Sequence, residues 1–379
     1  MIERLEPRIQ NYAWGSHTVL AALTGRNGPT VAPEAELWMG AHEAAPAGIA
    51  GSTLDRVIAA DPVGVLGAAC AQRFGGRLPF LLKVLAPERA LSIQCHPNAQ
   101  QAIDAPSGTY GDRWPKPEAL IAVTDYEIFV GLRPYAETAA FLRSLNLSRM
   151  DAVLAHCDVA PQPAQALLAS LLQTSDDARA TLVAEVVDAI GEHSDTDTTV
   201  AAVLRIAQQF PGDIGLVVLL TMVHRILRPG DYVFLPAGVL HAYVRGTCVE
   251  ILANSDNIVR AGLTPKAINI EELLRIVDVD QAMVPQQGTG DRVHSFPAQT
   301  QHFQLHVVGG GAGPVALPGA GAPRIALALD DEVTVSSAEG SVVLAPGQSC
   351  FLDAGADGVT ATGPGRLYLA AVPAEVVTV

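Results

Sequence analysis

The chain has 379 residues, of which 49% are hydrophobic and 17% charged, a composition that indicates globular domains and excludes an intrinsically disordered protein. This length exceeds what one ordinary core fills, so two or three domains are expected. The net charge of -15 argues against nucleic-acid binding, which needs a basic face. No apolar run reaches the roughly 20 residues of a membrane span, and the first residues lack an apolar signal core, so we expect a cytoplasmic protein.

Short β-strands punctuated by proline and glycine are predicted over residues 78–127. The runs LPFLLKVL and ALSIQCHPN are typical of strands, and EALIAVTDYEIFVGL is typical of a strand pair. In ALSIQCHPN, strand alternation puts Ser92, Gln94 and His96 on one face. A strand with three neighbouring polar side chains is either an exposed edge strand or one wall of a solvated site.

A second polar segment, Lys116-Pro117-Glu118, precedes the apolar run ALIAV. The lysine and the glutamate share a face, and Pro117 indicates a strand start or edge because proline cannot donate to a sheet ladder. Alone, such a pair usually belongs to a solvated surface. Because residues 92–96 form another polar segment of this kind, we favour the interpretation that both segments line one site.

Ala/Leu-rich segments with helical spacing follow Pro134. They are AETAAFLRSL, PAQALLASLLQ, DDARATLVAEVVDAIGEH and TTVAAVLRIAQQF. A further apolar helix is predicted over about residues 213–226, where His224 would have a structural role. Because β-structure resumes at Gly230, the helices are predicted to form an insertion into a β-domain.

Residues 230–266 combine a histidine, a carboxylate, an arginine and a lysine with strand and turn signals. Gly230, Pro236, Gly238 and His241 fit the spacing G-x5-P-x-G-x2-H, in which the turn residues bring the histidine onto the next strand. The pattern resembles the second conserved motif of cupins, small β-barrels that hold a metal in their mouth.

The rest of this run adds further polar candidates. Tyr243 shares the strand face of the histidine, and Glu250 lies in a second strand, VEILAN. The turn SDNIVRAG contains Asp256 and leads to Arg260, with Lys266 six residues later. Arg260 alone would be a surface loop residue, but an arginine and lysines near a metal would bind a phosphate and stabilise negative charge on a sugar oxygen.

From about residue 301 the sequence is rich in Val, Gly and Pro, which is typical of a second β-sandwich or jelly roll. APGQSCFLDAGADG is a weak internal repeat of the earlier turn. In this register Gly347 aligns with Gly230, and Gly358 falls where His241 would lie. A second barrel would therefore keep the turn and lack the ligand.

The predicted fold is mainly β with an α-helical insertion. It comprises a catalytic cupin (jelly-roll) barrel of residues 1–134 and 228–270, a helical domain of residues 135–227, and a second, C-terminal jelly-roll domain of residues 271–379.

The candidate metal ligands are Gln94, His96, Glu118 and His241. Two imidazoles, a carboxylate and an amide oxygen suit a borderline divalent ion such as zinc, with a position open for substrate. Two histidines and one carboxylate could also hold iron in a metal-dependent oxygenase. Against the oxygenase stand Gln94 and the phosphate-suited lysines.

Lysine is rare in this chain, and its positions are informative. There are only three, Lys83, Lys116 and Lys266, and each lies in or next to a polar motif. Compositional drift towards arginine explains the scarcity but not the positions, because an ammonium and a guanidinium are not interchangeable in a site. The five cysteines are scattered and never in a CxxC pair, so reduced thiols are expected.

Several sequence blocks resemble type I phosphomannose isomerases. They are NYAWGS (11–16), AELWMGAH (35–42), LPFLLKVLAPERALSIQCHPN (78–98), KPE (116–118), and PAGVLHAY with EILANSDNIVRAGLTPK (236–266). The resemblance implies a cupin interrupted by a helical domain and followed by a second jelly roll. It also implies that Gln94, His96, Glu118 and His241 hold one zinc ion per chain.

The same resemblance implies the roles of other residues. Arg260 would be catalytic, and Ser92 and the three lysines would line a sugar-phosphate pocket, with Lys116 also a catalytic candidate. Glu250, or a water at the metal, would carry a proton. Tyr243 and Asp256 are candidate substrate-binding residues.

One departure from the family pattern stands before Lys116. Family members usually carry Asn-His there, whereas this chain has Trp114 and Pro115, so the pocket near Lys116 is expected to differ in shape. The implied activity is interconversion of D-mannose 6-phosphate and D-fructose 6-phosphate through a cis-enediol, a step in GDP-mannose supply. A non-catalytic sugar-phosphate sensor is the remaining alternative. The expected partner is a small sugar phosphate, with no nucleic acid or membrane, and nothing in the sequence demands more than a monomer.

Overall fold

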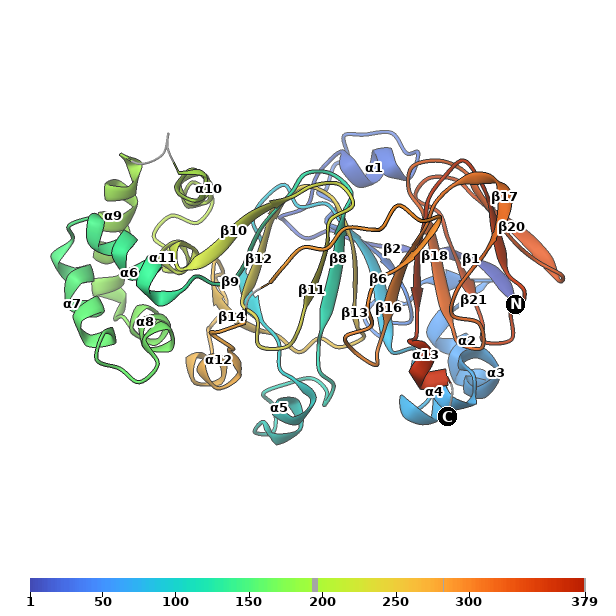
Figure 1. Ribbon diagram of the computed structural model, residues 1–379, viewed down its shortest axis with the longest axis horizontal. Helices are drawn as coiled ribbons and strands as arrows, with labels where there is room; N and C mark the ends of the chain where they lie inside the picture. Colours follow the sequence, from blue (N-terminus) through green and yellow to red (C-terminus); the bar gives the residue numbers. More distant parts are fainter. Residues whose placement is uncertain (193–196, 282, 378–379) are drawn as a thin grey trace.

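Four β-sheets and a group of helices are stacked along the long axis of the molecule in a computed structural model that describes residues 1–192, 197–281 and 283–377 (Figure 1). The order of layers is helices, a five-stranded sheet, a six-stranded sheet, an eight-stranded sheet and a four-stranded sheet. The expected mainly β fold with a helical insertion is confirmed. No helix in the described ranges is both long and apolar enough to cross a membrane.

The five- and six-stranded sheets face each other and form what we call the first sandwich. The five-stranded sheet has the order β10 (Met222–Leu227), β9 (Tyr126–Leu132), β12 (His241–Arg245), β7 (Ile93–Cys95) and β14 (Val259–Gly262). The six-stranded sheet has the order β11 (Tyr232–Leu235), β8 (Glu118–Ala122), β13 (Cys248–Ala253), β6 (Phe80–Leu85), β3 (Glu36–Met39) and β2 (Arg8–Gln10).

The eight- and four-stranded sheets form the second sandwich. The eight-stranded sheet has the order β15 (Val293–Ser295), β16 (Gln304–Val308), β23 (Leu367–Ala371), β18 (Arg324–Ala328), β21 (Ser349–Leu352), β1 (Ile2–Glu6), β4 (Gly48–Ile49) and β5 (Ser52–Thr53). The four-stranded sheet has the order β17 (Gly311–Ala316), β22 (Thr360–Gly363), β19 (Val333–Ser337) and β20 (Gly340–Leu344).

The six-stranded sheet is covered on both faces, which explains its nearly continuous apolar strands. In β6, Phe80, Leu82 and Val84 pack towards the eight-stranded sheet in one core with Ile325 and Phe351. The alternate residues of β6 face the inside of the first sandwich. Burial of these apolar faces joins the two sandwiches.

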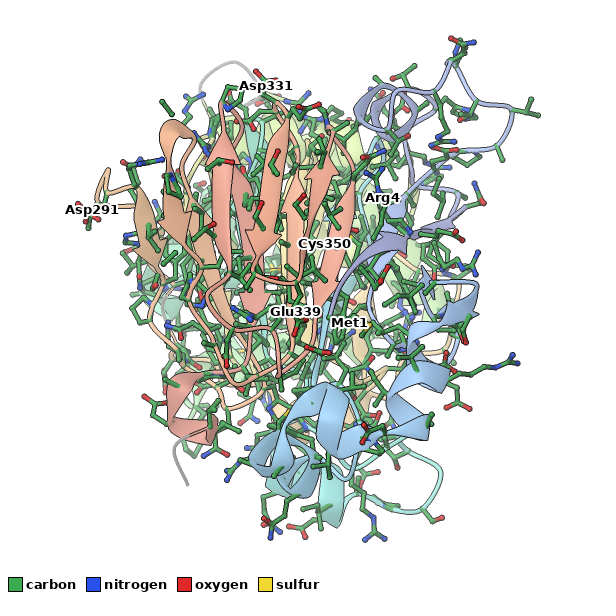
Figure 2. The ribbon with its side chains drawn as sticks, turned by 90° about the vertical axis from the view of Figure 1, so that its right-hand side faces the viewer. Met1, Arg4, Asp291, Asp331, Glu339 and Cys350 are labelled. Carbon is green, nitrogen blue, oxygen red and sulfur yellow. The ribbon has the colours of Figure 1, made fainter. Side chains whose placement is uncertain are left out.

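The N-terminal strand β1 belongs to a sheet that is otherwise built mainly from C-terminal strands. β1 pairs with β21, with Arg4 opposite Cys350, and Figure 2 shows β1 beside the C-terminal strands. The amino group of Met1 lies 2.9 Å from Asp353 Oδ1 and 3.6 Å from Glu339 Oε2. The division into residues 1–134, 135–227, 228–270 and 271–379 therefore stays a proposal, and β1 is a segment of the first range that sits in a sheet of the last.

The helical insertion follows β9 and ends before β10. It contains α6 (Tyr135–Ser144), α7 (Ser148–Cys157), α8 (Pro163–Leu172), α9 (Asp176–Gly191), α10 (Thr198–Ala207) and α11 (Gly215–Leu220). Their apolar faces pack on the outer side of the five-stranded sheet, around Ile93, Phe129 and Val259. α12 (Ile270–Ile276) joins the same core.

The remaining helices lie along the N-terminal segment, after β7 and at the C-terminal end. They are α1 (Val19–Leu23), α2 (Leu54–Ala60), α3 (Pro62–Leu66), α4 (Ala68–Arg73), α5 (Ala99–Asp104) and α13 (Ala374–Val377). All five cysteines are buried and unpaired, as expected.

One predicted element is wrong. The helix expected over about residues 213–226 ends at Leu220, and Met222–Leu227 form β10 at the edge of the five-stranded sheet. His224 therefore lies on a strand, where its ring stacks on Phe129 and its Nε2 is 3.0 Å from Glu127 Oε1. An apolar run of this kind does not distinguish a helix from a buried strand, and pairing with β9 decided it.

Candidate active site

Strand pairing brings distant polar residues to the inside of the first sandwich. In the five-stranded sheet, Gln94 is the register partner of both His241 and Arg260. In the six-stranded sheet, Glu250 is the register partner of Lys83. Because side chains alternate along each strand, all five point away from the apolar outer faces and into the space between the sheets.

Two histidines and a glutamate form a buried cluster between the sheets. His96 Nε2 lies 3.1 Å from Glu118 Oε1, and His241 Nε2 lies 3.3 Å from Glu118 Oε2. The ligand atoms of the three residues all lie within 4.8 Å of one another. Lys116 Nζ is 3.5 Å from Glu118 Oε1, and the Tyr243 hydroxyl donates to Glu118 Oε2 at 3.2 Å.

The backbone fixes which nitrogen of each histidine can bind a cation. His96 Nδ1 donates to the Asn257 carbonyl at 2.7 Å, and His241 Nδ1 donates to the Val239 carbonyl at 3.0 Å. Each Nε2 of the neutral ring is then an acceptor. Both Nε2 atoms are buried and make no hydrogen bond within the described ranges.

The protonation of this cluster suits a metal. Burial lowers the pKa of His96 to about 4, which keeps its imidazole neutral. Burial alone would raise the pKa of Glu118, but His96 and Lys116 outweigh it and hold that pKa well below the usual range. With both rings neutral, two Nε2 lone pairs face the Glu118 carboxylate at about hydrogen-bond distance, and a cation between them relieves that contact. Gln94, on the same inner face, offers an amide oxygen, so the donor set fits a borderline divalent ion.

A buried ion cluster lies beside this group on the six-stranded sheet. Lys83 Nζ is 3.4 Å from Glu36 Oε2 and 3.7 Å from Glu250 Oε2, and it lies 4.8 Å from the centre of the Trp38 ring. Burial alone would lower the pKa of Lys83, but Glu36 and Glu250 outweigh it and raise that pKa. Burial, reinforced by Glu118 and partly offset by Lys83, raises the pKa of Glu250 to about 8.

A cavity of about 790 Å³ opens onto both groups. Ten of the residues singled out in the sequence line it: Lys83, Ser92, Gln94, Lys116, Glu118, Tyr243, Glu250, Asp256, Arg260 and Lys266. His96 and His241 are buried next to it through their contacts with Glu118. The structure therefore brings all twelve candidates to one place, while their individual roles stay predictions.

The two ends of the cavity differ in charge. Towards the six-stranded sheet, Lys83 and Lys116 are paired with carboxylates. At the other end, Arg89, Arg260 and Lys266 form no ion pair with any residue that the structure describes. Partial burial lowers the pKa of Arg260. This end is the part of the cavity that can accept an anionic group of a ligand.

Asp256 stands at the junction with a second cavity of about 740 Å³. Its Oδ1 lies 3.2 Å from Nε2 of the buried His42. The Ala44 N–H donates to His42 Nδ1 at 3.2 Å, so the ring proton is on Nε2 and is donated to Asp256. This hydrogen bond lowers the pKa of Asp256.

Besides Arg89, sequence reasoning missed four further residues that shape the site. Glu36, Trp38 and His42 belong to the block AELWMGAH, where the acid and the tryptophan alternate onto the inner face of β3. Asn257 is almost fully buried, and its amide holds the loop before Lys116. An acid within an apolar run was the available signal for Glu36; the sequence held no signal for the contacts that Asn257 makes with residues 111–114.

The Asn257 side chain holds that loop through backbone contacts. Its Oδ1 accepts from the N–H groups of Gly111 and Asp112 at 3.1 and 3.3 Å, and its Nδ2 donates to the carbonyls of Asp112 and Trp114, both at 2.9 Å. Trp114 itself packs edge-on against Phe74, outside the residues that line the cavity.

The sequence and the fold are similar to those of known proteins. Residues 2–135 match the family model "Phosphomannose isomerase type I, catalytic domain". The chain is 32% identical over 392 residues to a mannose-6-phosphate isomerase of Salmonella typhimurium, covering 97% of this chain and 98% of the relative. A solved lysine-to-alanine variant of phosphomannose isomerase from the same organism is similar with a TM-score of 0.89 and 31% identity, over 98% of this chain and 100% of the other. A zinc-bound holo mannose 6-phosphate isomerase structure matches with a TM-score of 0.86 and 31% identity, over 98% and 99% of the two chains.

Proposed function

Since the chain belongs to the type I phosphomannose isomerase family and is thus an isomerase, we propose that it interconverts D-mannose 6-phosphate and D-fructose 6-phosphate with the help of one zinc ion. The observation that carries the proposal is the pair of buried acceptor nitrogens of His96 and His241 facing ionised Glu118, at the wall of a cavity whose other end bears unpaired cations.

His96, Glu118 and His241, with Gln94, would hold the metal. Zinc bound there would supply a Lewis acid for the sugar oxygens. The hydrogen bonds from His96 to the Asn257 carbonyl and from His241 to the Val239 carbonyl orient the two rings.

The isomerisation needs one proton moved between two carbons. Glu250 accepts the proton from C2 of mannose 6-phosphate and returns it to C1, while a hydroxyl proton moves from O2 to O1, and the species between the two transfers is a cis-enediol. A pKa of about 8 suits a carboxyl that must both take and give a proton near neutral pH. Arg260 neutralises the negative charge that grows on the sugar oxygens.

The charge asymmetry of the cavity supports one orientation of the sugar. Glu250 and the metal cluster lie at the end where the lysines are already paired with carboxylates. The unpaired Arg89 and Lys266 suit the 6-phosphate, with the Ser92 hydroxyl as a further donor. The reacting carbons would then lie towards Glu250.

A coupled isomerase assay after chelation tests this function. Activity with mannose 6-phosphate should fall to background when the metal is removed and should return with zinc, with manganese, cobalt and iron added separately for comparison. Binding of mannose 6-phosphate to the zinc-loaded protein without turnover would contradict the proposal and favour a sensor. Oxygen uptake with turnover of a substrate would favour an oxygenase.

We further propose that the protein works as a cytoplasmic monomer on this small substrate. Light scattering coupled to size-exclusion chromatography tests the monomer: a mass near 39.6 kDa is expected for one chain.

A further inference from the structure

The connector between α10 and α11, residues 208–214, runs from the helical insertion to the mouth of the catalytic cavity. Gln209 makes two contacts with the segment before β7: its Oε1 accepts from the Ala90 N–H at 3.0 Å, and its carbonyl accepts from Arg89 Nη2 at 3.5 Å. The Phe210 ring lies 6.0 Å from the Arg89 guanidinium carbon, and both residues line the cavity. One side of the mouth is therefore held by the insertion.

Asp213, in the same connector, holds the segment after β14 on the other side. Its Oδ1 accepts from Leu263 N–H at 2.9 Å and from Gly215 N–H at 2.7 Å, and its Oδ2 accepts from Thr264 N–H at 3.1 Å. Leu263 has a φ of 55°, a left-handed conformation that costs free energy in a residue with a branched side chain. A carboxylate that accepts two consecutive backbone donors is what keeps this turn in place.

The two backbones also meet too closely for a side chain to fit between them. A Cβ on Gly215 would lie 2.7 Å from the Leu263 nitrogen and 3.0 Å from the Gly262 Cα. The insertion and β14 therefore touch through two glycines. Lys266 follows three residues after Leu263, is exposed, and lines the cavity.

We propose that the connector is part of the substrate site, with Asp213 and Gln209 as positioning residues that hold Lys266 and Arg89 at the mouth to receive the phosphate. The inference rests on the proposed sugar-phosphate substrate. An exposed lysine or arginine loses rotamer freedom when it binds an anion, and an anchored backbone lowers the part of that cost which comes from the loop. The helical insertion thereby contributes to substrate affinity and not only to the core.

Asp213→Asn tests the first half. In the variant, the side-chain NH2 group must face one of the backbone N–H groups that donate to Asp213 in the wild type. Two donors then face each other, which loosens the turn. We expect KM for mannose 6-phosphate to rise about tenfold, the equivalent of one lost hydrogen bond to a charged group, with kcat and zinc content unchanged. Asp197→Asn is the matched control, because Asp197 also accepts from two backbone N–H groups, of Thr199 and Val200, at the start of α10. Its KM should equal that of the wild type.

A double-mutant cycle separates positioning from general destabilisation. In a Lys266→Ala background, Asp213→Asn should change KM by less than about twofold, because the cation that it positions is already gone. A full tenfold rise in that background, or a fall in kcat with KM unchanged, would overturn the role of Asp213.

The Arg89 side gives an independent reading if Asp213→Asn does not fold. Gln209→Ala should raise KM in the wild-type background and leave it unchanged in Arg89→Ala; equal effects in both backgrounds refute the proposal. Titration calorimetry with inorganic phosphate repeats both cycles without turnover. If the wild type binds phosphate but does not isomerise the sugar, the proposed function is wrong. The phosphate titrations of the variants would still show whether the connector positions the anion site.

Discussion

Between its two sheets, the first sandwich holds His96, Glu118 and Lys83, whereas the second holds Val335, Leu352 and Leu369. Both sandwiches place a strand directly after a glycine turn, with φ of 92° at Gly230 and 78° at Gly347. The strands that follow, β11 and β21, both turn a phenylalanine into the core between the sandwiches. The shared turn therefore builds the scaffold, and the inward side chains alone distinguish a site from a filled core.

The two sandwiches also differ at the strand that carries the candidate metal ligand His241 in the first of them. β12 begins at His241 itself, while β22 begins at Thr360, two residues after Gly358. The one guanidinium buried deep in the second sandwich within the described ranges, that of Arg324, donates to the backbone carbonyls of Pro318 and Ala356. Its charge serves the structure of a loop, whereas the cations of the first sandwich line a cavity.

A histidine substitution in the first sandwich should abolish zinc binding, whereas one in the second sandwich should leave it unchanged. His241→Ala removes one of the acceptors that face Glu118, so we expect loss of bound zinc and a fall in kcat/KM of more than about a hundredfold. His306→Ala is the matched control: His306 is buried in the second sandwich with an unpartnered Nε2, but its Nδ1 contacts the Ser295 hydroxyl, and no carboxylate of the described residues pairs with it. Elemental analysis of bound metal and the coupled assay should show zinc and activity retained in His306→Ala; equal metal loss in both variants would refute the assignment.

Glu250→Gln sharpens the contrast by removing a proton acceptor without changing shape. We expect kcat to fall by about 10²- to 10⁴-fold, the range typical of a lost general base, while zinc content stays at one per chain. Activity within a factor of about two of the wild type would show that another group moves the proton. Lys83 loses one of its two carboxylate partners in this variant, so a thermal unfolding scan should accompany the kinetics.

Features of the fold and the site that depend on neighbouring residues could be predicted from the sequence, whereas those that depend on contacts between distant segments could not. Alternation along 92–96 and the spacing around His241 indicated the inward residues, because both are local properties of strands. The pairing of β1 with β21 joins the two ends of the chain, and nothing local in IERLE indicates it. Glu36 was overlooked although it is the one acid in the apolar run ELWM, and the run that forms β10 was assigned to a helix because its pairing with β9 is not a local property of the sequence.

The second sandwich should respond to substitutions in stability and not in catalysis. Leu369 is fully buried among apolar side chains, and Leu369→Ala should lower the free energy of unfolding by about 2–5 kcal/mol. Urea denaturation measures that loss, and kcat/KM of the folded fraction should stay at the wild-type value. A clear fall in kcat/KM with zinc retained would mean that the core between the sandwiches transmits changes to the site.

The smallest expected effect concerns the outer face of the five-stranded sheet, where Glu127 on β9 joins Arg205 of α10, His224 of β10 and Arg245 of β12. Burial alone would raise the pKa of Glu127, but His224 and Arg205 outweigh it and lower that pKa to about 2 from 4.5. A carboxyl with a lowered folded-state pKa contributes its full stability above pH 4.5, and loses it as the pH falls towards 2; the shift corresponds to at most about 3 kcal/mol, because solvent screens the partly exposed Arg205 and Arg245. Glu127→Gln should therefore be less stable than the wild type at pH 6, and the gap in unfolding free energy should narrow at pH 3. Glu185→Gln, at an exposed pair with Arg149, should show no such gap, and a gap for Glu127→Gln that stayed constant down to pH 2 would mean that packing, not charge, ties the helical insertion to the strand that carries His241.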